Sequence, residues 1–167
     1  MDIQNYSQRY EKEVVELWNK ALTYDAITVH KFRKQALFDD NYDTELSLIA
    51  LENDRVLGFL LATKRKFPYL ERGLEPTQGW INVMFVDDDH KRKGIGKTLV
   101  KRAEEKLTSM GAETVTLGAY SPNYFFPGVD KDSYSGAMKF FDKIGYQAGK
   151  ESYSIRTSES KSESSCC

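Results

Sequence analysis

Positively charged side chains gather around two glycines in the segment FVDDDHKRKGIGKTLVKRAEEKL. The cations are Lys91, Arg92, Lys93 and Lys97, and the glycines are Gly94 and Gly96. Apolar spacing predicts a helix after these glycines, and a helix N-terminus already carries about half a positive charge, so further cations are normally unfavourable there. A bound anion would remove this conflict, because successive backbone N–H groups flanked by cations form a site for phosphate or pyrophosphate.

The simpler alternative is that the three acids at 87–89 neutralise the cations on a solvated surface. Gly94 and Gly96 favour a ligand, because each costs about 0.5–1 kcal/mol in a helix start relative to alanine unless the backbone must approach something closely. The Rossmann pattern needs a third glycine where Leu99 stands, and a Walker loop needs four residues between its glycines, so neither nucleotide motif matches.

The elements that would position this turn follow from hydrophobic periodicity. Helical spacing predicts helices at 10–22, 28–38, 95–110 and 135–146. Runs of β-prone residues predict strands at 45–53, 55–65, 79–87, 112–120 and 151–156. Asn53-Asp54 suits a hairpin turn, and Gly111 suits the left-handed residue that ends a helix. This order predicts an α+β fold with a mixed sheet, because the strands and helices do not alternate regularly.

Composition bounds the class of protein. The 167 residues fit one domain. Twenty-four basic residues against 25 acidic ones give a net charge of -1, so no overall electrostatic attraction to nucleic acid is expected. No apolar run approaches the roughly 18 residues of a membrane span, and the first residues do not match a signal peptide. We therefore expect a soluble, cytoplasmic protein with neither nucleic acid nor membrane as a partner.

The C-terminal segment differs from the rest of the chain. Residues 157–167 are serine-rich and charged and hold no large apolar side chain, which predicts a disordered tail after a domain at 1–156. The only two cysteines, Cys166 and Cys167, lie at its end. They are too few and too badly placed for a disulfide framework or a zinc site, so no metal is expected.

Two motifs together resemble the acetyl-CoA-dependent N-acetyltransferases of the Gcn5-related superfamily (GNAT). The family's loop, Gln/Arg-x-x-Gly-x-Gly/Ala after a strand, is similar to KRKGIG at 91–96, with lysine in the first place. Its later segment, Asn-x-x-Ala-x-x-x-Tyr-x-x-x-Gly-Phe, is similar to YSGAMKFFDKIGY at 134–146. The resemblance covers about residues 1–156. It implies a mostly antiparallel mixed sheet of about six to seven strands, about four flanking helices and a splayed central strand pair.

The resemblance also implies acetyl-CoA as co-substrate and an amine as acceptor. The pantetheine amides would pair with the exposed strand end at Met84, Phe85 and Val86. The pyrophosphate would lie on the turn and helix start formed by Lys91, Arg92, Lys93, Gly94, Ile95, Gly96 and Lys97. Backbone N–H groups would supply most of the affinity.

The residues that would move protons depart from the family's pattern. The family often uses the tyrosine of the later segment as the acid for the departing thiolate, but Phe141 stands there. Tyr134, two turns earlier on the same helix face, is the substitute candidate; packing at the helix start, or contact with pantetheine, is the alternative. Tyr120 and Tyr124 are further candidates of the same kind.

For the general base, Asp87 at the mouth of the splayed strand is the candidate, with capping of the turn as its alternative. His90, beside lysines, reads as a solvated surface histidine. Asn82 is predicted on the strand face opposite Ile81 and Val83, where it either donates to substrate or is an ordinary buried asparagine.

Two long connections, at 63–79 and 120–134, suit an acceptor site because loops of this length are often functional. Tyr124, Phe125 and Phe126 would wall that pocket, or else cover the sheet edge. We expect transfer of acetyl from acetyl-CoA to a primary amine of a small molecule or a peptide terminus. A non-catalytic acyl-CoA-binding module, or one half of a tandem acetyltransferase, is the alternative. A monomer and a homodimer both remain open.

Overall fold

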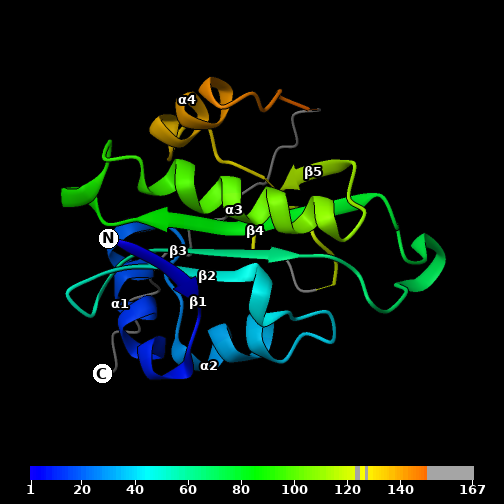
Figure 1. The fold of residues 1–167 in the computed structure, drawn as a ribbon, viewed down its shortest axis with the longest axis horizontal. Helices are drawn as coiled ribbons and strands as arrows, with labels where there is room; N and C mark the ends of the chain where they lie inside the picture. The colour runs from blue at the N-terminus through cyan, green and yellow to red at the C-terminus, as the bar shows by residue number, and fades with distance from the viewer. Residues whose placement is uncertain (123–124, 127, 150–167) are drawn as a thin grey trace, which may run out of the picture.

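The computed structural model describes residues 1–122, 125–126 and 128–149. Figure 1 shows a central sheet with helices on both faces. The predicted strand at 151–156, the tail at 157–167 and Tyr124 lie outside the described residues. The domain boundary near residue 156 therefore stays a prediction.

One mixed sheet forms the centre of the molecule. Its strands, in spatial order, are β1 (Asp2–Asn5), β2 (Ser47–Glu52), β3 (Arg55–Thr63), β4 (Gln78–Val86) and β5 (Thr114–Leu117). The first three pairings are antiparallel and β4–β5 is parallel. The mixed α+β prediction is confirmed, and the described residues form five strands, fewer than the six to seven expected. One of these, β1, was not predicted, because DIQN is short and buries only Ile3.

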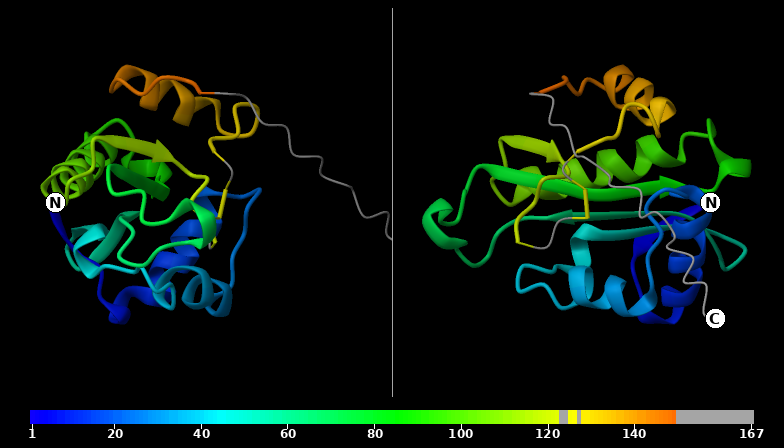
Figure 2. Two further views of the ribbon diagram at one scale, coloured as in Figure 1. Left: turned by 90° about the vertical axis from the view of Figure 1, so that its right-hand side faces the viewer. Right: turned by 180° about the vertical axis from the view of Figure 1, so that it is seen from behind.

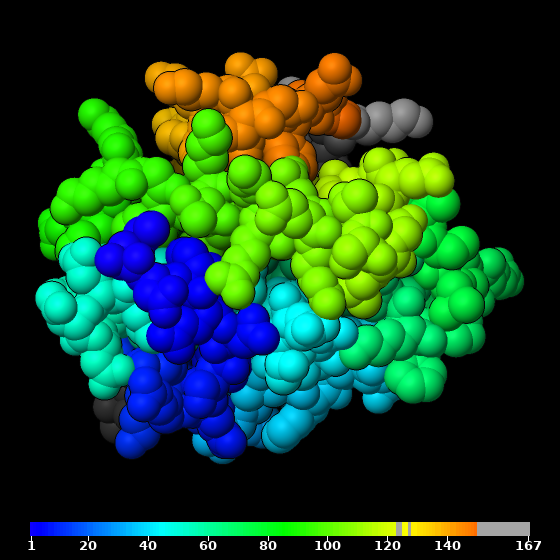
Figure 3. All heavy atoms as spheres, in the orientation of Figure 1, coloured from blue at the N-terminus to red at the C-terminus, as the bar shows by residue number. Residues whose placement is uncertain are grey.

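Helices cover both faces of the sheet. They are α1 (Glu11–Ala21), α2 (Val29–Phe32), α3 (Ile95–Ser109) and α4 (Ser135–Lys143), and α2 continues in a π-helical turn at Arg33–Leu37. Short 3₁₀ turns lie at Gln8–Tyr10, Thr44–Leu46, Leu70–Arg72 and Asp88–His90. Two views agree that α1 and α2 lie on one face and α3 on the other, with α4 beyond α3 (Figures 1 and 2). In the space-filling view, α4 forms a ridge above α3 (Figure 3).

A separate apolar core lies on each face. Trp18, Phe32, Phe59 and Phe85 pack edge to face or tilted between the sheet and the α1 layer. On the other face, the predicted stripe of α3 is fully buried against β3 and β4, at Ile95, Leu99, Ala103 and Leu107. Each large apolar side chain stabilises the fold by about 1.5–3 kcal/mol when it is fully buried. This burial fixes the start of α3 beside the end of β4.

The predicted turns are also present. Asn53 and Asp54 have φ of 51° and 61°, the left-handed pair that a two-residue hairpin between twisted strands requires. Gly111, with φ of 90°, follows the end of α3.

Candidate active site

Strands β4 and β5 stop pairing halfway along β4. Its register with β5 runs from Gln78 to Ile81, and Gly118 N–H then donates to the Ile81 carbonyl at 2.8 Å. Gly118 and Ala119 both take positive φ, which turns the chain away from β4. Along 83–86, β4 pairs with β3 on one side and, among the described residues, with no strand on the other. This unpaired part of β4 is the edge predicted for pantetheine.

A β-bulge marks the point where the strands part. Ala62 pairs with Ile81 and Leu61 with Val83, so Asn82 is an extra residue. The bulge changes the phase of β4, because Ile81 packs in the α3 core and Val83 in the α1 core. The predicted placement of Asn82 opposite both neighbours is therefore wrong, since it assumed an unbroken period of two. Its Nδ2 donates to Thr63 Oγ1 at 2.8 Å.

The glycine turn has the geometry of an anion site. Gly94 precedes α3 with φ of 83°, and Arg92 also takes a left-handed φ of 62°. No side chain caps α3, so nothing in the described part of the chain competes for the N–H groups of its first turn. Gly96 lies close to α4 and β4, because an added Cβ would make a tight contact of 3.3 Å with Phe140 Cζ and an ordinary one of 3.6 Å with Met84 Cε.

Most of the cations at this turn are not neutralised. Lys91 pairs with Asp88 at 2.5 Å. Within the described ranges no carboxylate lies within ion-pair distance of the exposed Arg92, Lys93 and Lys97. The other two acids of the run turn away, since both pair with Lys20 of α1. Neutralisation by the acids at 87–89 thus accounts for Lys91 alone, and the remaining positive charge suits an anionic ligand.

Asp87 is buried in a charged network at the end of β4. Its side chain is 1% exposed; Oδ1 accepts from Lys20 Nζ at 2.6 Å, and Oδ2 lies 2.8 Å from His90 Nδ1 and 3.7 Å from Arg55. The Lys20 hydrogen bond, and then that of His90, lower the pKa of Asp87 despite its burial. A low pKa makes Asp87 a weak base, so this geometry suits anchoring the turn to α1 better than taking a proton.

Tyr134 lies at the start of α4 and joins it to the loop after α1. Its hydroxyl donates to Asp25 Oδ2 at 2.8 Å, and its ring meets Tyr24 edge to face at 5.9 Å. Tyr134 and Asp25 lie near the unpaired edge of β4. Trp18 makes this link, because its Nε1 donates to the Asp25 carbonyl and its ring packs on Phe85 of β4. Tyr134 is thus at the mouth of the site, but its hydroxyl already has a protein partner.

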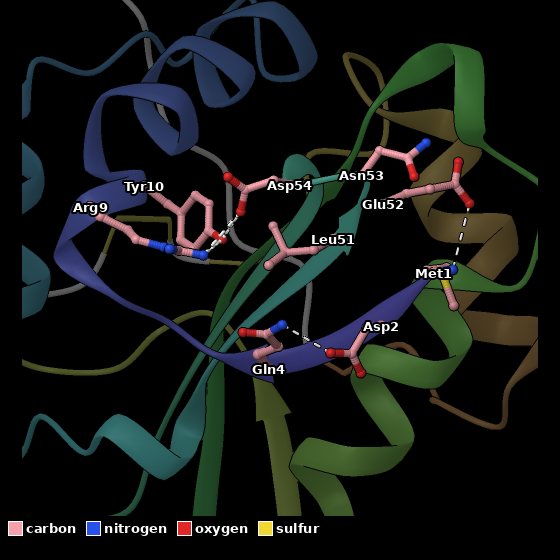
Figure 4. A pocket seen from close by; sticks show the side chains of 9 residues that line it. All are labelled: Met1, Asp2, Gln4, Arg9, Tyr10, Leu51, Glu52, Asn53 and Asp54. Carbon is pink, nitrogen blue, oxygen red and sulfur yellow. Dashed lines mark hydrogen bonds and ion pairs between the residues drawn. The ribbon is translucent and has the colours of Figure 1, made fainter.

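A cavity of about 220 Å³ opens beside this pair. It is lined by Trp18, Tyr24, Asp25, Ala26, Ile27, Lys31, Phe125 and Phe126. Phe125 and Phe126 pack on Trp18 at 5.0 and 6.1 Å, so the two predicted aromatic residues that the structure describes do wall a pocket. Figure 4 shows a second hollow, of about 300 Å³, between β1 and the β2–β3 turn. It lies at the opposite edge of the sheet, where Arg9, Tyr10 and Asp54 bond to one another.

Tyr120 is held inside the fold. The ring is 1% exposed, and the hydroxyl accepts from Asn41 Nδ2 at 2.8 Å and donates to Asp39 Oδ1 at 2.9 Å. Burial raises its pKa. Arg65, which sequence analysis did not single out, lies over the Tyr120 and Trp80 rings and donates to the Ser121 carbonyl at 2.8 Å. These contacts tie the 63–79 connection to the segment after β5. The sequence gives no signal for them, because Arg65 and its partners come from different segments of the chain.

The residue in the family's tyrosine position has a packing role. Phe141 is buried in the α3 core and meets the Phe140 and Tyr146 rings edge to face. Tyr146 donates to Glu104 Oε1 of α3 at 2.6 Å. These contacts hold α4 on α3 and place Phe140 beside Gly96.

Among the described residues, no helix combines the length and the apolar character that crossing a bilayer requires. Within the same ranges, no three His, Cys, Asp or Glu side chains cluster as a candidate metal site.

The open strand edge, the bulge and the glycine turn point to one group of enzymes. Residues 11–146 match the model of the Acetyltransferase (GNAT) family, and the chain belongs to this family. The family uses acetyl-CoA as co-substrate. The resemblance drawn from the two motifs is thereby confirmed.

Two similar proteins are named N-alpha-acetyltransferase 30. The one from Schizosaccharomyces pombe is 23% identical over 150 residues, which cover 89% of this chain and 85% of that protein. The one from Dictyostelium discoideum is 33% identical over 73 residues, which cover 44% of this chain and 36% of that protein. The chain thus spans only about a third of the Dictyostelium relative.

Solved structures share the fold. The aminoglycoside antibiotic 6′-N-acetyltransferase from Acinetobacter haemolyticus is 17% identical, with 95% of this chain and 99% of that chain covered and a TM-score of 0.63. At this identity the likeness shows the fold alone.

Proposed function

We propose that the protein transfers acetyl from acetyl-CoA to a primary amine, with peptide N-termini as the first acceptor class and small-molecule amines as the second. One observation carries the proposal. Within the described ranges, three exposed cations without a carboxylate partner surround an uncapped helix start, directly beside the part of β4 that no strand pairs with on one side. An anionic head joined to a chain of amides would satisfy both features at once.

The residues present suit acetyl-CoA. The side chains of Arg92, Lys93 and Lys97 would hold the pyrophosphate, together with backbone N–H groups at the start of α3. Gly94, Ile95 and Gly96 supply that backbone. Lys91 adds a positive charge, which its ion pair with Asp88 partly offsets. The backbone of Met84, Phe85 and Val86 would receive the pantetheine amides. The acetyl thioester supplies the activated acyl group when it is bound.

The chain itself would orient the amine and assist proton movement. Tyr134 remains the proposed acid for the departing thiolate, since it lies beside the cavity with its hydroxyl on Asp25. In that role it would need to release Asp25 during the reaction. Asp87 remains the proposed base, and it would act only through a water molecule, because both its oxygens are engaged and its pKa is lowered.

The choice of peptide termini as the first acceptor class rests on the relatives named N-alpha-acetyltransferase 30. The cavity beside α1 would receive the first residue of the acceptor between the rings of Trp18 and Phe126 and the charged side chains of Asp25 and Lys31. Small-molecule amines remain in the proposal, since the solved aminoglycoside enzyme shares the fold.

A thiol-release assay with acetyl-CoA tests the proposal. The acceptors are a panel of short peptides that differ only in the first residue, together with small primary amines; each best acceptor is repeated with its amine blocked as the control. Acceptor-dependent release of coenzyme A is expected, and the blocked control should give none.

One observation favours the alternative function, a non-catalytic acyl-CoA-binding module: the apolar Phe141 stands in the family's tyrosine position. Loss of a thiolate does not always need a protein acid, so this substitution does not decide between the two functions. Tight binding of acetyl-CoA without release for any amine would favour the module.

A further inference from the structure

The bulge in β4 leaves one buried hydrogen-bond acceptor without a partner. Asn82 is 5% exposed, and its Oδ1 has no hydrogen-bond partner within the part of the chain that the structure describes. The other end of the same amide is fixed, because Nδ2 donates to Thr63 Oγ1 at 2.8 Å. An unpaired acceptor in the interior is costly, so an asparagine held in this way indicates a missing donor.

The position of Asn82 indicates where that donor comes from. Asn82 is the first residue past Ile81, the last β4 residue in register with β5. It also stands one residue before the unpaired edge at 83–86. Bulges of this kind commonly re-aim a side chain next to an active site. The free oxygen therefore lies where the edge for the pantetheine chain ends and the reacting carbonyl is expected.

Other unpartnered polar atoms in the described residues do not share this position. Tyr6 Oη and Ser47 Oγ belong to the β1–β2 side of the sheet. Arg65 Nη2 belongs to a guanidinium packed among aromatic rings, whose other nitrogens are bonded to Glu75 and Ser121. Gln35 Oε1 belongs to the π-helical turn at Arg33–Leu37. Asn82 alone among these five combines burial, an unused acceptor and adjacency to the open part of β4.

We propose that Asn82 Oδ1 accepts a hydrogen bond from the acceptor's amine and so aims the nitrogen lone pair at the thioester carbon. This inference rests on the proposed acetyl transfer. In that reaction the C–N bond forms, the C–S bond breaks, and the amine's surplus proton ends on the thiolate or in solvent. Asn82 stays neutral throughout and takes no proton, because its role is to orient the amine.

The test compares three variants, with the best peptide of the thiol-release panel as the acceptor probe. Asn82→Leu removes the free oxygen and fills a similar volume, Asn82→Asp keeps an acceptor oxygen, and Thr63→Val removes only the partner of Nδ2. We expect Asn82→Leu to lower kcat/KM for the peptide about tenfold, which corresponds to about 1.4 kcal/mol. Asn82→Asp should be faster than Asn82→Leu, and Thr63→Val should lose less than Asn82→Leu. The Kd for acetyl-CoA and the melting temperature should stay close to wild type in Asn82→Leu.

A second readout does not depend on turnover. In the ¹H–¹⁵N spectrum, the Asn82 side-chain peaks, identified by their absence from Asn82→Leu, should shift when the peptide is added to protein loaded with coenzyme A. The inference is overturned if these peaks stay in place, if folded Asn82→Leu keeps the wild-type kcat/KM, or if Asn82→Leu weakens acetyl-CoA binding as much as it slows the reaction. If the wild-type protein turns over no amine at all, the proposed function falls and this inference falls with it.

Discussion

Neutralising Lys93 and Lys97 should make the free protein more stable and its binding of acetyl-CoA weaker. Both side chains are exposed at the start of α3, and no described carboxylate pairs with either. Without a ligand they oppose the positive end of the helix. With a pyrophosphate present the same charges become attractive. Opposite effects on stability and affinity therefore follow from the single claim that this turn binds an anion.

Simple electrostatics gives the expected change in the affinity for acetyl-CoA and in the stability of the free protein. Two unit charges about 5 Å apart attract by about 0.8 kcal/mol in water and about 3 kcal/mol at an effective dielectric constant near 20. We take about 1 kcal/mol for each exposed lysine, so Lys93→Gln with Lys97→Gln should raise the Kd roughly 30-fold. Removing a cation from a helix N-terminus stabilises by about 0.3–1 kcal/mol. The double variant should therefore gain about 1 kcal/mol, or about 2–4 °C in melting temperature.

Calorimetry with acetyl-CoA and thermal melts of the free protein measure the two effects. Lys101→Gln is the matched control, because Lys101 lies one turn further along α3 and pairs only weakly with Glu105 at 3.8 Å. The control should change neither quantity by more than about 0.5 kcal/mol. The Kd difference should shrink in about 1 M salt, where the Debye length is about 3 Å. Unchanged affinity in the double variant, or equal losses of affinity in the double variant and the control, would show that this turn does not bind the pyrophosphate.

Three further predictions concern the same region. Gly96→Leu should abolish acetyl-CoA binding, because its side chain would meet Phe140 and fill the turn; calorimetry that finds wild-type uptake would contradict this. Tyr134→Phe should slow turnover and alter the alkaline limb of its pH profile, whereas an unchanged rate and profile would exclude Tyr134 as the acid. Asp87→Asn should lower the melting temperature at neutral pH and narrow its gap to wild type in acid. The folded pKa of Asp87 lies below its ordinary value of 3.8, so its contribution is present above that value and lost as the pH falls through the folded pKa. A gap that is constant from pH 7 to pH 3 would argue against the Lys20 pair as its source.

Local patterns predicted much of the fold. Helix α3 follows from apolar spacing that continues over four turns, and the β2–β3 hairpin follows from Asn53-Asp54, whose left-handed φ the structure confirms. The glycine turn could also be predicted, because its residues are adjacent in the chain. Strand β1 was missed, since four residues with one buried side chain carry little periodic signal.

Contacts between distant residues could not be predicted. Asp87 was predicted as a general base or as a cap of the turn, and neither prediction included the ion pair of its buried carboxylate with Lys20, 67 positions earlier. The phase change at Asn82 depends on the pairing of β3 with β4, so counting every second residue misplaced its side chain. Arg65 gave no signal because its aromatic neighbours Trp80 and Tyr120 come from two other segments.

A crystal structure with bound coenzyme A would show directly whether the glycine turn holds the cofactor. We expect the pyrophosphate on the backbone N–H groups between Arg92 and Lys97, with the pantetheine chain along the unpaired edge at 83–86. A structure with coenzyme A bound elsewhere and this turn left empty would contradict this expectation.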